Sequence, residues 1–297
     1  MSHILLKFTD YVEDFLRGSL YMNTLHYFWY EYRNQKINDY LLSHPGEDRV
    51  PITALQSHVP QEDMFEGSIG IGNTVDNELD KYALTDTAYR AVGYKYCNVM
   101  CMYRLEYQFE AFSDVGQMVH YDVPQMDDFG DSVIIITDEN EFLRRIMRAA
   151  EKERYLFLCG NVKYWTPKNA DIMSKKHHLL FESEPVDMNS EPFVSSIKIH
   201  RDCFQKMDNH KNEKEWRIAL YRGVKETKAY RLEIGSIRDI AICVSKEDLI
   251  KEIDRLFRNG KIKQCGEEYY GNVSRRELRQ KFYELGDNKA QMLVTVG

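Results

Sequence analysis

Three short extended segments follow one another in the C-terminal half of the chain with no helix between them. They cover residues 215–222 (EWRIALYR), 228–234 (KAYRLEI) and 239–244 (DIAICV). Consecutive strands of this kind pair readily as antiparallel neighbours, whereas a doubly wound parallel sheet needs a helix between almost every pair of strands. The pattern therefore predicts an α+β fold with a mixed or antiparallel central sheet and flanking helices.

Further segments supply the rest of this fold. Apolar and aromatic runs predict extended chain over residues 3–8, 19–30, 95–107, 132–137 and 156–165. Helical spacing of apolar residues predicts helices over 11–16, 139–153 and 247–258, with a last one after Ser274. Their ends carry matching signals, because Gly18 follows the first helix and Ser274 with Glu277 forms a capping box for the last.

No linker or repeat divides the 297 residues, and the seven prolines are scattered. We therefore predict one α+β domain over residues 1–258. Residues 259–273 hold three glycines among mixed charges, which predicts a loop. Residues 259–297 are accordingly predicted to form a C-terminal loop and helical extension.

Composition narrows the class of protein. Hydrophobic residues make up 43% and charged residues 29%, which is typical of a globular chain and excludes disordered or fibrous classes. The net charge of −7 argues against a general nucleic-acid coat, which needs a basic face. No apolar run approaches the roughly 20 residues that span a bilayer. The six cysteines form no CxxC pair. We expect a cytoplasmic protein with no membrane contact.

Two acidic segments stand out in the charge pattern. Residues 61–80 contain six acids and residues 122–141 contain seven, and neither segment contains Lys or Arg. Such segments could attract a basic partner or mimic nucleic acid. They are more typical of solvated loops and helix starts, and they do not identify a protein or nucleic-acid target.

Several common chemistries lack their motifs. The run Gly67–Gly72 (GSIGIG) has no following Walker lysine, which favours a turn over a phosphate loop. The chain has no GxSxG elbow of a serine hydrolase. Its histidines and cysteines are irregularly spaced, so we expect no metal.

The segment Glu213–Leu220 (EKEWRIAL) carries the most informative charges. Two acids two residues apart point to the same side of an extended chain, and here they are Glu213 and Glu215. Ile218 and Leu220 already serve the core. One interpretation is that Glu215, helped by Glu213, faces a cleft. The other is a strand edge whose charges pair with their neighbours.

The N-terminal part offers partners for such a cleft. Lys7 lies on a short strand, and a helix ending at Gly18 leads to an aromatic strand with three polar side chains: Tyr21, Asn23 and Tyr27. Asp63 and Glu66 follow after a long loop. A basic residue, an aromatic strand and a distant glutamate could together bind a dinucleotide, with its base stacked on a ring and its ribose hydroxyls on a carboxylate.

Three segments together resemble a known group of proteins. They are Gly18–Met22 (GSLYM), Asp63–Gly67 (DMFEG) and Glu213–Ile218 (EKEWRI). Over roughly residues 1–245 the chain looks like a family of uncharacterised proteins of bacterial and prophage genomes. The order of a strand with a polar residue, a helix, an aromatic strand and a much later glutamate resembles the ADP-ribosyltransferase-like superfamily, particularly its DarT-type and PARP-like members.

The resemblance implies NAD as the substrate and Glu215 as the catalytic residue, with Glu213 beside it. In these enzymes the catalytic glutamate would bind the 2′-hydroxyl of the nicotinamide ribose and stabilise the oxocarbenium-like state as nicotinamide leaves. The family carries Arg or His on its first strand to hold that ribose. Lys7 stands at this place here, and His3 is the other option.

The same resemblance implies that Tyr21 or Tyr27 stacks on the nicotinamide ring. With Lys7, Asn23 and Arg217 they make up the predicted NAD-binding set. The setting it implies is a toxin or a factor of phage defence or counter-defence. Two alternatives stay open: a degenerate, non-enzymatic domain that binds a protein or nucleotide, and an acidic interaction protein that mimics nucleic acid.

Overall fold

The computed structural model describes residues 2–28, 42–45, 68–73, 86–112, 116–121, 130–165, 185–187 and 202–295. The main sheet contains β1 (Ser2–Phe8), β2 (Ser19–Thr24), β5 (Asn98–Phe112), β6 (Gly116–Tyr121), β7 (Ser132–Ile136), β8 (Leu156–Asn161), β12 (Glu215–Tyr221), β13 (Tyr230–Glu233), β14 (Ala241–Ser245) and β15 (Tyr269–Gly271). The helices are α1 (Val12–Leu16), α4 (Glu139–Lys152), α6 (Leu249–Arg258) and α7 (Arg275–Leu285).

Shorter elements surround this core. The 3-10 helices η2 (Val92–Tyr96) and η5 (Asp208–Glu213) precede β5 and β12, respectively. A four-stranded sheet joins β10 (Pro185–Asp187), β16 (Lys289–Thr295), β4 (Asp86–Ala91) and β3 (Ser68–Asn73). A parallel pair joins β9 (Lys163–Trp165) to β11 (Gln205–Met207).

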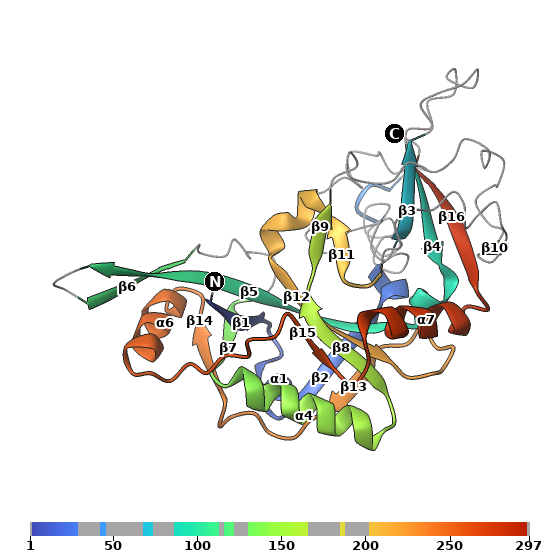
Figure 1. Ribbon diagram of the computed structural model, residues 1–297. Helices are drawn as coiled ribbons and strands as arrows, with labels where there is room; N and C mark the ends of the chain where they lie inside the picture. The colour runs from blue at the N-terminus through green and yellow to red at the C-terminus, as the bar shows by residue number, and fades with distance from the viewer. Residues whose placement is uncertain are drawn as a thin grey trace.

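Within the described residues the main sheet has ten strands, with the path β14-β7-β1-β5-β12-β8-β15, and the pairs along it are antiparallel. β2 pairs with both β5 and β13, and β6 continues as a hairpin from the far end of β5 (Figure 1). The predicted α+β class with an antiparallel sheet is confirmed. The predicted strands 3–8 and 215–222 lie in one sheet, because both pair with β5.

One face of the sheet packs on α4. The helix begins at Asp138, whose side chain accepts a hydrogen bond from the Glu141 amide at 3.0 Å, as the capping pattern predicted. Phe142 and Ile146 on its apolar side are fully buried. They meet the even-numbered residues of β5 and β12, such as Met100 and Ile218, in one continuous core.

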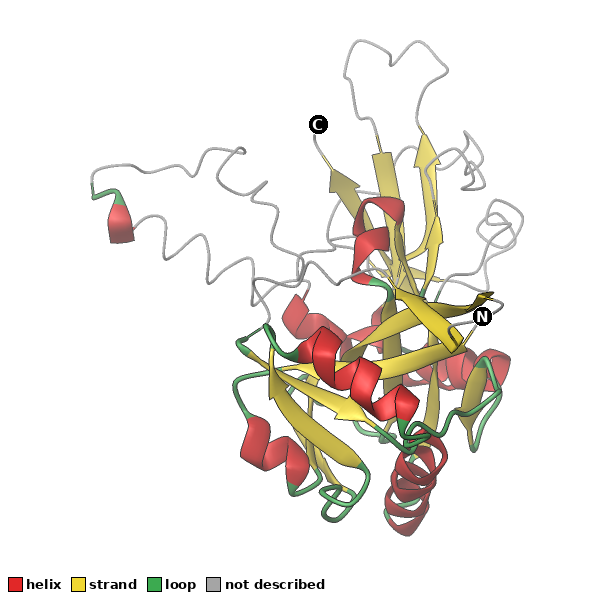
Figure 2. Cartoon of the chain, turned by 90° about the vertical axis from the view of Figure 1, so that its left-hand side faces the viewer, coloured by secondary structure: helices red, strands yellow, loops and turns green. Residues whose placement is uncertain are grey.

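The opposite face carries two separate apolar clusters, and Figure 2 shows the helices placed around the strands. α6 covers the cluster around Tyr103 and Leu105, whereas α7 covers the cluster around Val99 and Ala219. Odd-numbered residues of β5 and β12 point to this face. Cys101 therefore lies between the two clusters, on a stretch of sheet that neither helix fills with apolar side chains.

Two strand boundaries differ from the sequence predictions. The turn predicted at residues 67–72 is wrong where the structure describes it, because residues 68–73 form β3 and pair with β4 through an irregular register between Ser68 and Gly70. β2 ends at Thr24 rather than at residue 30, so Tyr27 lies beyond the strand.

Residues 259–273 are also more than a loop, since they contain β15 and the buried Cys265. The division at residue 258 stays a prediction. In the part of the chain that the structure describes, no helix has the length and apolar character needed to cross a membrane.

The acidic segments are described only in part. Residues 61–67, 74–80 and 122–129 lie outside the described residues, and so do Asp63 and Glu66. In the described remainder of 122–141, Asp138 caps α4 and pairs with Lys263 at 3.0 Å, and Glu139 is buried against His3. These acids serve internal contacts of the fold.

The packing of α7 gives a first prediction. Phe282 is fully buried and its ring lies 5.2 Å from those of both Tyr94 and Tyr221. Phe282→Ala should lower the free energy of unfolding by about 3–5 kcal/mol, because it leaves a cavity at this contact. Lys281→Ala, on the exposed side of the same helix, should leave it close to the wild-type value. Urea unfolding of both variants tests this, and equal losses would contradict it.

Candidate functional site

A gap along one edge of β5 creates the site. β1 pairs with residues 103–107 of β5, and β2 pairs with residues 98–99. β12 occupies the opposite edge over residues 98–103, so β1 and β2 share the remaining edge. Residues 100–102 of β5 lie between these two partners. Helix α1 joins β1 to β2, so the chain itself spans the opening.

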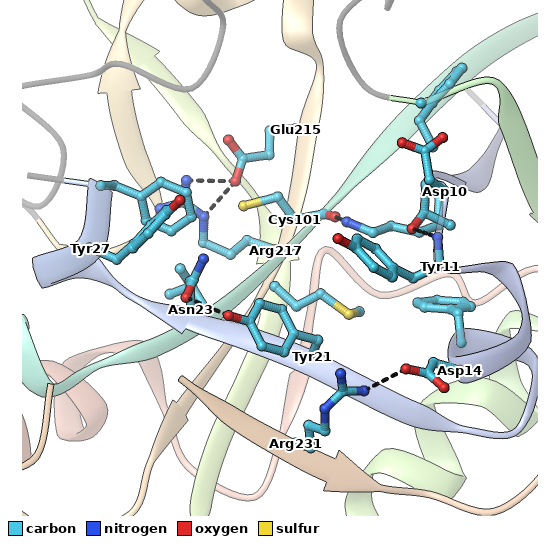
Figure 3. A pocket seen from close by; sticks show the side chains of 18 of the residues that line it. Asp10, Tyr11, Asp14, Tyr21, Asn23, Tyr27, Cys101, Glu215, Arg217 and Arg231 are labelled. Carbon is cyan, nitrogen blue, oxygen red and sulfur yellow. Dashed lines mark hydrogen bonds and ion pairs between the residues drawn. The ribbon is translucent and has the colours of Figure 1, made fainter. Parts of the chain in front are cut away.

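A cavity of about 620 Å³ lies at this gap. Seven side chains of the predicted catalytic and NAD-binding sets line it: Lys7, Tyr21, Asn23, Tyr27, Glu213, Glu215 and Arg217. Figure 3 shows Tyr21, Asn23 and Tyr27 on one side of the opening and Glu215 across from them. His3, the alternative to Lys7, is instead buried, with its Nε2 3.0 Å from a carboxylate oxygen of Glu139.

The side chain of Lys7, on β1, reaches into the gap along the edge of β5. Its Nζ donates a hydrogen bond of 2.8 Å to the carbonyl oxygen of Cys101, which lies in the gap. Burial lowers the pKa of Lys7, and the electrostatic influence of Cys101 and of Glu215 opposes that effect. The amine is thus held at the wall of the cavity close to Glu215.

Glu215 is buried at 5% exposure and is held by cations. Arg217 Nε donates to its Oε1 at 2.6 Å, and Arg217 Nη2 lies 2.5 Å from the same oxygen (Figure 3). Lys206 Nζ lies 3.2 Å from its Oε2. Burial alone would raise the pKa of Glu215, but the charges of Arg217 and Lys206 outweigh it and lower the pKa to about 2.

The expected arrangement of Glu213 beside Glu215 on one strand is wrong. β12 begins at Glu215, whereas Glu213 ends η5, and Lys214 between them has a left-handed φ of 38°. Both carboxylates nevertheless line the cavity. They meet through Lys206, whose Nζ is 2.7 Å from Glu213 and 3.2 Å from Glu215.

Glu213 is engaged on both oxygens. Oε2 accepts from Lys206 and Oε1 lies 2.7 Å from Nδ1 of His210. Through these two contacts Glu213 anchors η5 to β11, and both of its carboxylate oxygens are engaged by protein groups. Glu213 is therefore a structural partner of Lys206.

The mouth of the cavity is aromatic and charged. Tyr21 is 50% exposed, and its hydroxyl donates to Asn23 Oδ1 at 3.2 Å. The guanidinium of Arg231 lies 5.3 Å from the Tyr21 ring centre and donates to Asp14 at 2.9 Å. Tyr11 nearby is 76% exposed. These open ring faces can stack with a planar ligand.

Formal charges in the cavity wall balance. Four cations line it (Lys7, Lys206, Arg217 and Arg231), and so do four carboxylates (Asp10, Asp14, Glu213 and Glu215). Four residues of this wall were not predicted from the sequence: Lys206, Cys101, Arg231 and Asp14. Arg231 directly faces Tyr21 in the β2–β13 pair, a neighbour that depends on long-range register rather than on any local motif.

No family model, curated protein or solved structure matches this chain in comparisons with known proteins. Among the described residues, no group of three or more His, Cys, Asp or Glu side chains is placed to hold a metal ion.

The lowered pKa of Glu215 predicts acid sensitivity. Because its pKa falls from 4.5 unfolded to about 2 folded, ionised Glu215 adds stability above pH 4.5, which is lost as the pH falls toward 2. At about 1.4 kcal/mol per pH unit this window is worth about 3 kcal/mol. Urea unfolding from pH 2 to 7 should show Glu215→Gln destabilised at neutral pH and converging with wild type in acid. Glu226→Gln, an exposed control, should follow wild type throughout. A pH-independent deficit in Glu215→Gln would contradict the assignment.

Proposed function

We propose that the chain is an ADP-ribosyltransferase-like protein that binds NAD in this cavity and cleaves the bond between nicotinamide and ribose. One observation carries the proposal. Side chains from separate parts of the sequence, chosen from the pattern of strands and the resemblance, line a single cavity where β1 and β2 diverge from β5.

Size and charge support a dinucleotide as ligand. A volume of about 620 Å³ lies within the range of roughly 300–1,000 Å³ that is usual for cofactor-sized ligands. NAD carries a positive pyridinium ring and a negative pyrophosphate. A wall with cations and carboxylates in equal number can accept both signs, and the tyrosines at the mouth offer faces for its two planar bases.

In this proposal Glu215 is the catalytic residue. Its carboxylate accepts a hydrogen bond from the 2′-hydroxyl of the nicotinamide ribose and stabilises the positive charge that develops as the C–N bond breaks. Nicotinamide leaves with the bonding electron pair, and a nucleophilic acceptor forms the new bond to C1′ and loses its proton. Lys7 binds near the ribose, and Tyr21 or Tyr27 stacks on the nicotinamide.

A second candidate function is a nucleotide-binding domain without catalysis. The contacts of Glu215 favour it, because a carboxylate has about four lone-pair positions. Arg217 Nε donates to Oε1, Arg217 Nη2 lies 2.5 Å from the same oxygen, Lys206 Nζ lies 3.2 Å from Oε2, and the Cys101 side chain also hydrogen-bonds to this carboxylate. A ribose hydroxyl therefore competes with these groups for the carboxylate oxygens. The weak thiol donor of Cys101 is the easiest to displace.

A cytoplasmic setting, a bacterial or phage origin and a role as a toxin or a phage-defence factor belong to the same proposal and rest on the sequence resemblance. The modified target is a protein or a nucleic acid.

NAD consumption by the wild-type protein tests the proposal first. Calorimetry measures NAD binding, and chromatography measures released nicotinamide. Glu215→Gln should keep NAD binding and lose at least about 10²-fold in cleavage rate, because the amide lacks the charge that stabilises the developing cation. Glu226→Gln should cleave NAD at the wild-type rate. Rates are compared well below the melting temperature of each variant, with circular dichroism as the folding control.

Three outcomes separate the candidates. Cleavage by wild type that depends on Glu215 supports the transferase. Binding without cleavage supports the nucleotide-binding domain. Wild type that neither binds nor cleaves NAD excludes both candidates in their NAD-dependent form.

The mouth of the cavity gives a separate prediction. Tyr21→Ala removes a half-exposed ring and leaves the fold intact. Loss of one stacked base is worth about 1–3 kcal/mol, so NAD binding should weaken roughly 5- to 100-fold. Tyr270→Ala, outside this cavity, is the matched control and should bind NAD as wild type does. Equal affinity of wild type and Tyr21→Ala would remove Tyr21 from the binding set.

A further inference from the structure

An alternating chain of charges crosses the wall of the cavity. It runs from Glu213 to Lys206, Glu215 and Arg217, and the imidazole of His210 contacts Glu213 at one end. Lys206 and Glu215 are each about 95% buried, and Arg217 is fully buried. Arg217 also donates to the carbonyl oxygen of Cys203, three residues before Lys206. The chain of charges therefore ties η5, β11 and β12 together behind the catalytic carboxylate of the proposed reaction.

We propose that Lys206 is the positioning residue of this site: its ammonium group bridges Glu213 and Glu215 and fixes the second carboxylate toward the cavity. The bridge itself stands on contacts in the structure, and its consequence for catalysis rests on the proposed function.

The parallel pair β9–β11 makes this a two-point clamp on the first residue of β12. Tyr164 of β9 lies directly opposite Lys206 in the register. The backbone N–H of Glu215 donates to the Tyr164 hydroxyl at 2.8 Å, and the Lys206 ammonium meets the carboxylate of the same residue at 3.2 Å. Tyr164 thus holds the backbone of Glu215 while Lys206 holds its side chain.

The bridge explains why a lysine is buried at this position. A buried ammonium is costly unless it is paired and hydrogen-bonded. Lys206 meets two carboxylates at once, and Glu213 is itself held by His210 on its other oxygen. Removing Lys206 leaves Glu213 and Glu215 facing the same buried space without the cation between them.

The described elements around Glu215 present these titratable or charged groups to it: Lys7 from β1, Cys101 and Tyr103 from β5, Tyr164 from β9, Lys206 from β11, Glu213 from η5 and Arg217 from β12. Loss of the Lys206 charge removes an attraction to ionised Glu215 and exposes it to Glu213. Both effects raise the pKa of Glu215, so the acid limb of any rate that needs ionised Glu215 moves to higher pH.

Lys206→Met and Lys206→Arg test the bridge, with Lys163→Met as the control. Lys163 lies on the neighbouring β9, is half-exposed and pairs with Glu268 at 3.0 Å. The first readout needs no NAD. Carbon-13 NMR of labelled glutamate follows the titration midpoint of Glu215, with Glu215→Gln identifying its signal. Lys206→Met should raise that midpoint by about one pH unit or more, and Lys206→Arg should restore most of it.

Glu213→Gln separates the charge effect from loosening of η5. It breaks the anchor of Lys206 but removes a negative charge, so the midpoint of Glu215 should stay at or below the wild-type value. If Lys206 had only a structural role, Glu213→Gln and Lys206→Met would shift the titration midpoint of Glu215 in the same way. If Lys206→Met does not fold, Lys206→Arg and Glu213→Gln still decide. The first should hold the Glu215 midpoint close to the wild-type value and the second at or below it, and a midpoint raised by about one pH unit in either would overturn the proposal.

The second readout is the pH profile of NAD cleavage. Lys206→Met should move the acid limb of this profile to higher pH by the same amount as the titration midpoint of Glu215. In Lys206→Arg the limb should return most of the way to its wild-type pH. An unchanged midpoint and an unchanged limb in folded Lys206→Met would overturn the proposal. A shifted midpoint in a protein that never cleaves NAD would uphold the bridge and defeat only the proposed function.

Discussion

The divided edge of β5 is the constraint on which the site depends. A strand edge can hydrogen-bond only one partner at each residue, and here β1 and β2 take different stretches of it. The carbonyl oxygen of Cys101 lies in the interval between these stretches, where a Lys7 ammonium reaches it instead of a ladder amide. The Lys7 side chain thereby supplies the hydrogen bond that this backbone carbonyl needs. It also places a polar group at the wall of the cavity.

The same constraint decides which face of the sheet holds the charges. Even-numbered residues of β5 and β12 join the core under α4, and odd-numbered ones face α6 and α7. Between those two helices the odd-numbered positions are Cys101, Glu215 and Arg217. Since apolar cover is missing there, the buried charges must neutralise one another, and the contacts of Lys206 and Arg217 with Glu213 and Glu215 do so.

Local sequence signals predicted much of the fold because they act over few residues. The capping box of Ser274 with Glu277, and the cap of α4 by Asp138, are contacts between residues three apart. Alternation along β12 correctly separated Ile218 and Leu220 from the charged side. The same rule failed at Glu213, because one left-handed residue, Lys214, breaks the extended chain that the two-residue spacing assumes.

Lys206 and Arg231 were beyond sequence reasoning for a different reason. β11 is only three residues long, and its lysine reaches the cavity through a parallel partner some forty residues earlier in the chain. Arg231 meets Tyr21 only through the register of β13 on β2. Neither pairing leaves a periodic pattern. A lone lysine or arginine on a short strand is usually exposed, so sequence alone favours the solvent-facing assignment.

Lysine at position 7 shapes what the cavity can do with a ligand. Arginine offers a planar fork of five donors, whereas an ammonium offers three donors at one point. Lys7 already directs one of these to the Cys101 carbonyl. Two donors remain for oxygen atoms of a ligand, and burial lowers the pKa of this amine. A ligand that brings negative charge close to Lys7 favours its protonated form, so binding at this wall is coupled to uptake of a proton as the pH rises toward the pKa of the amine.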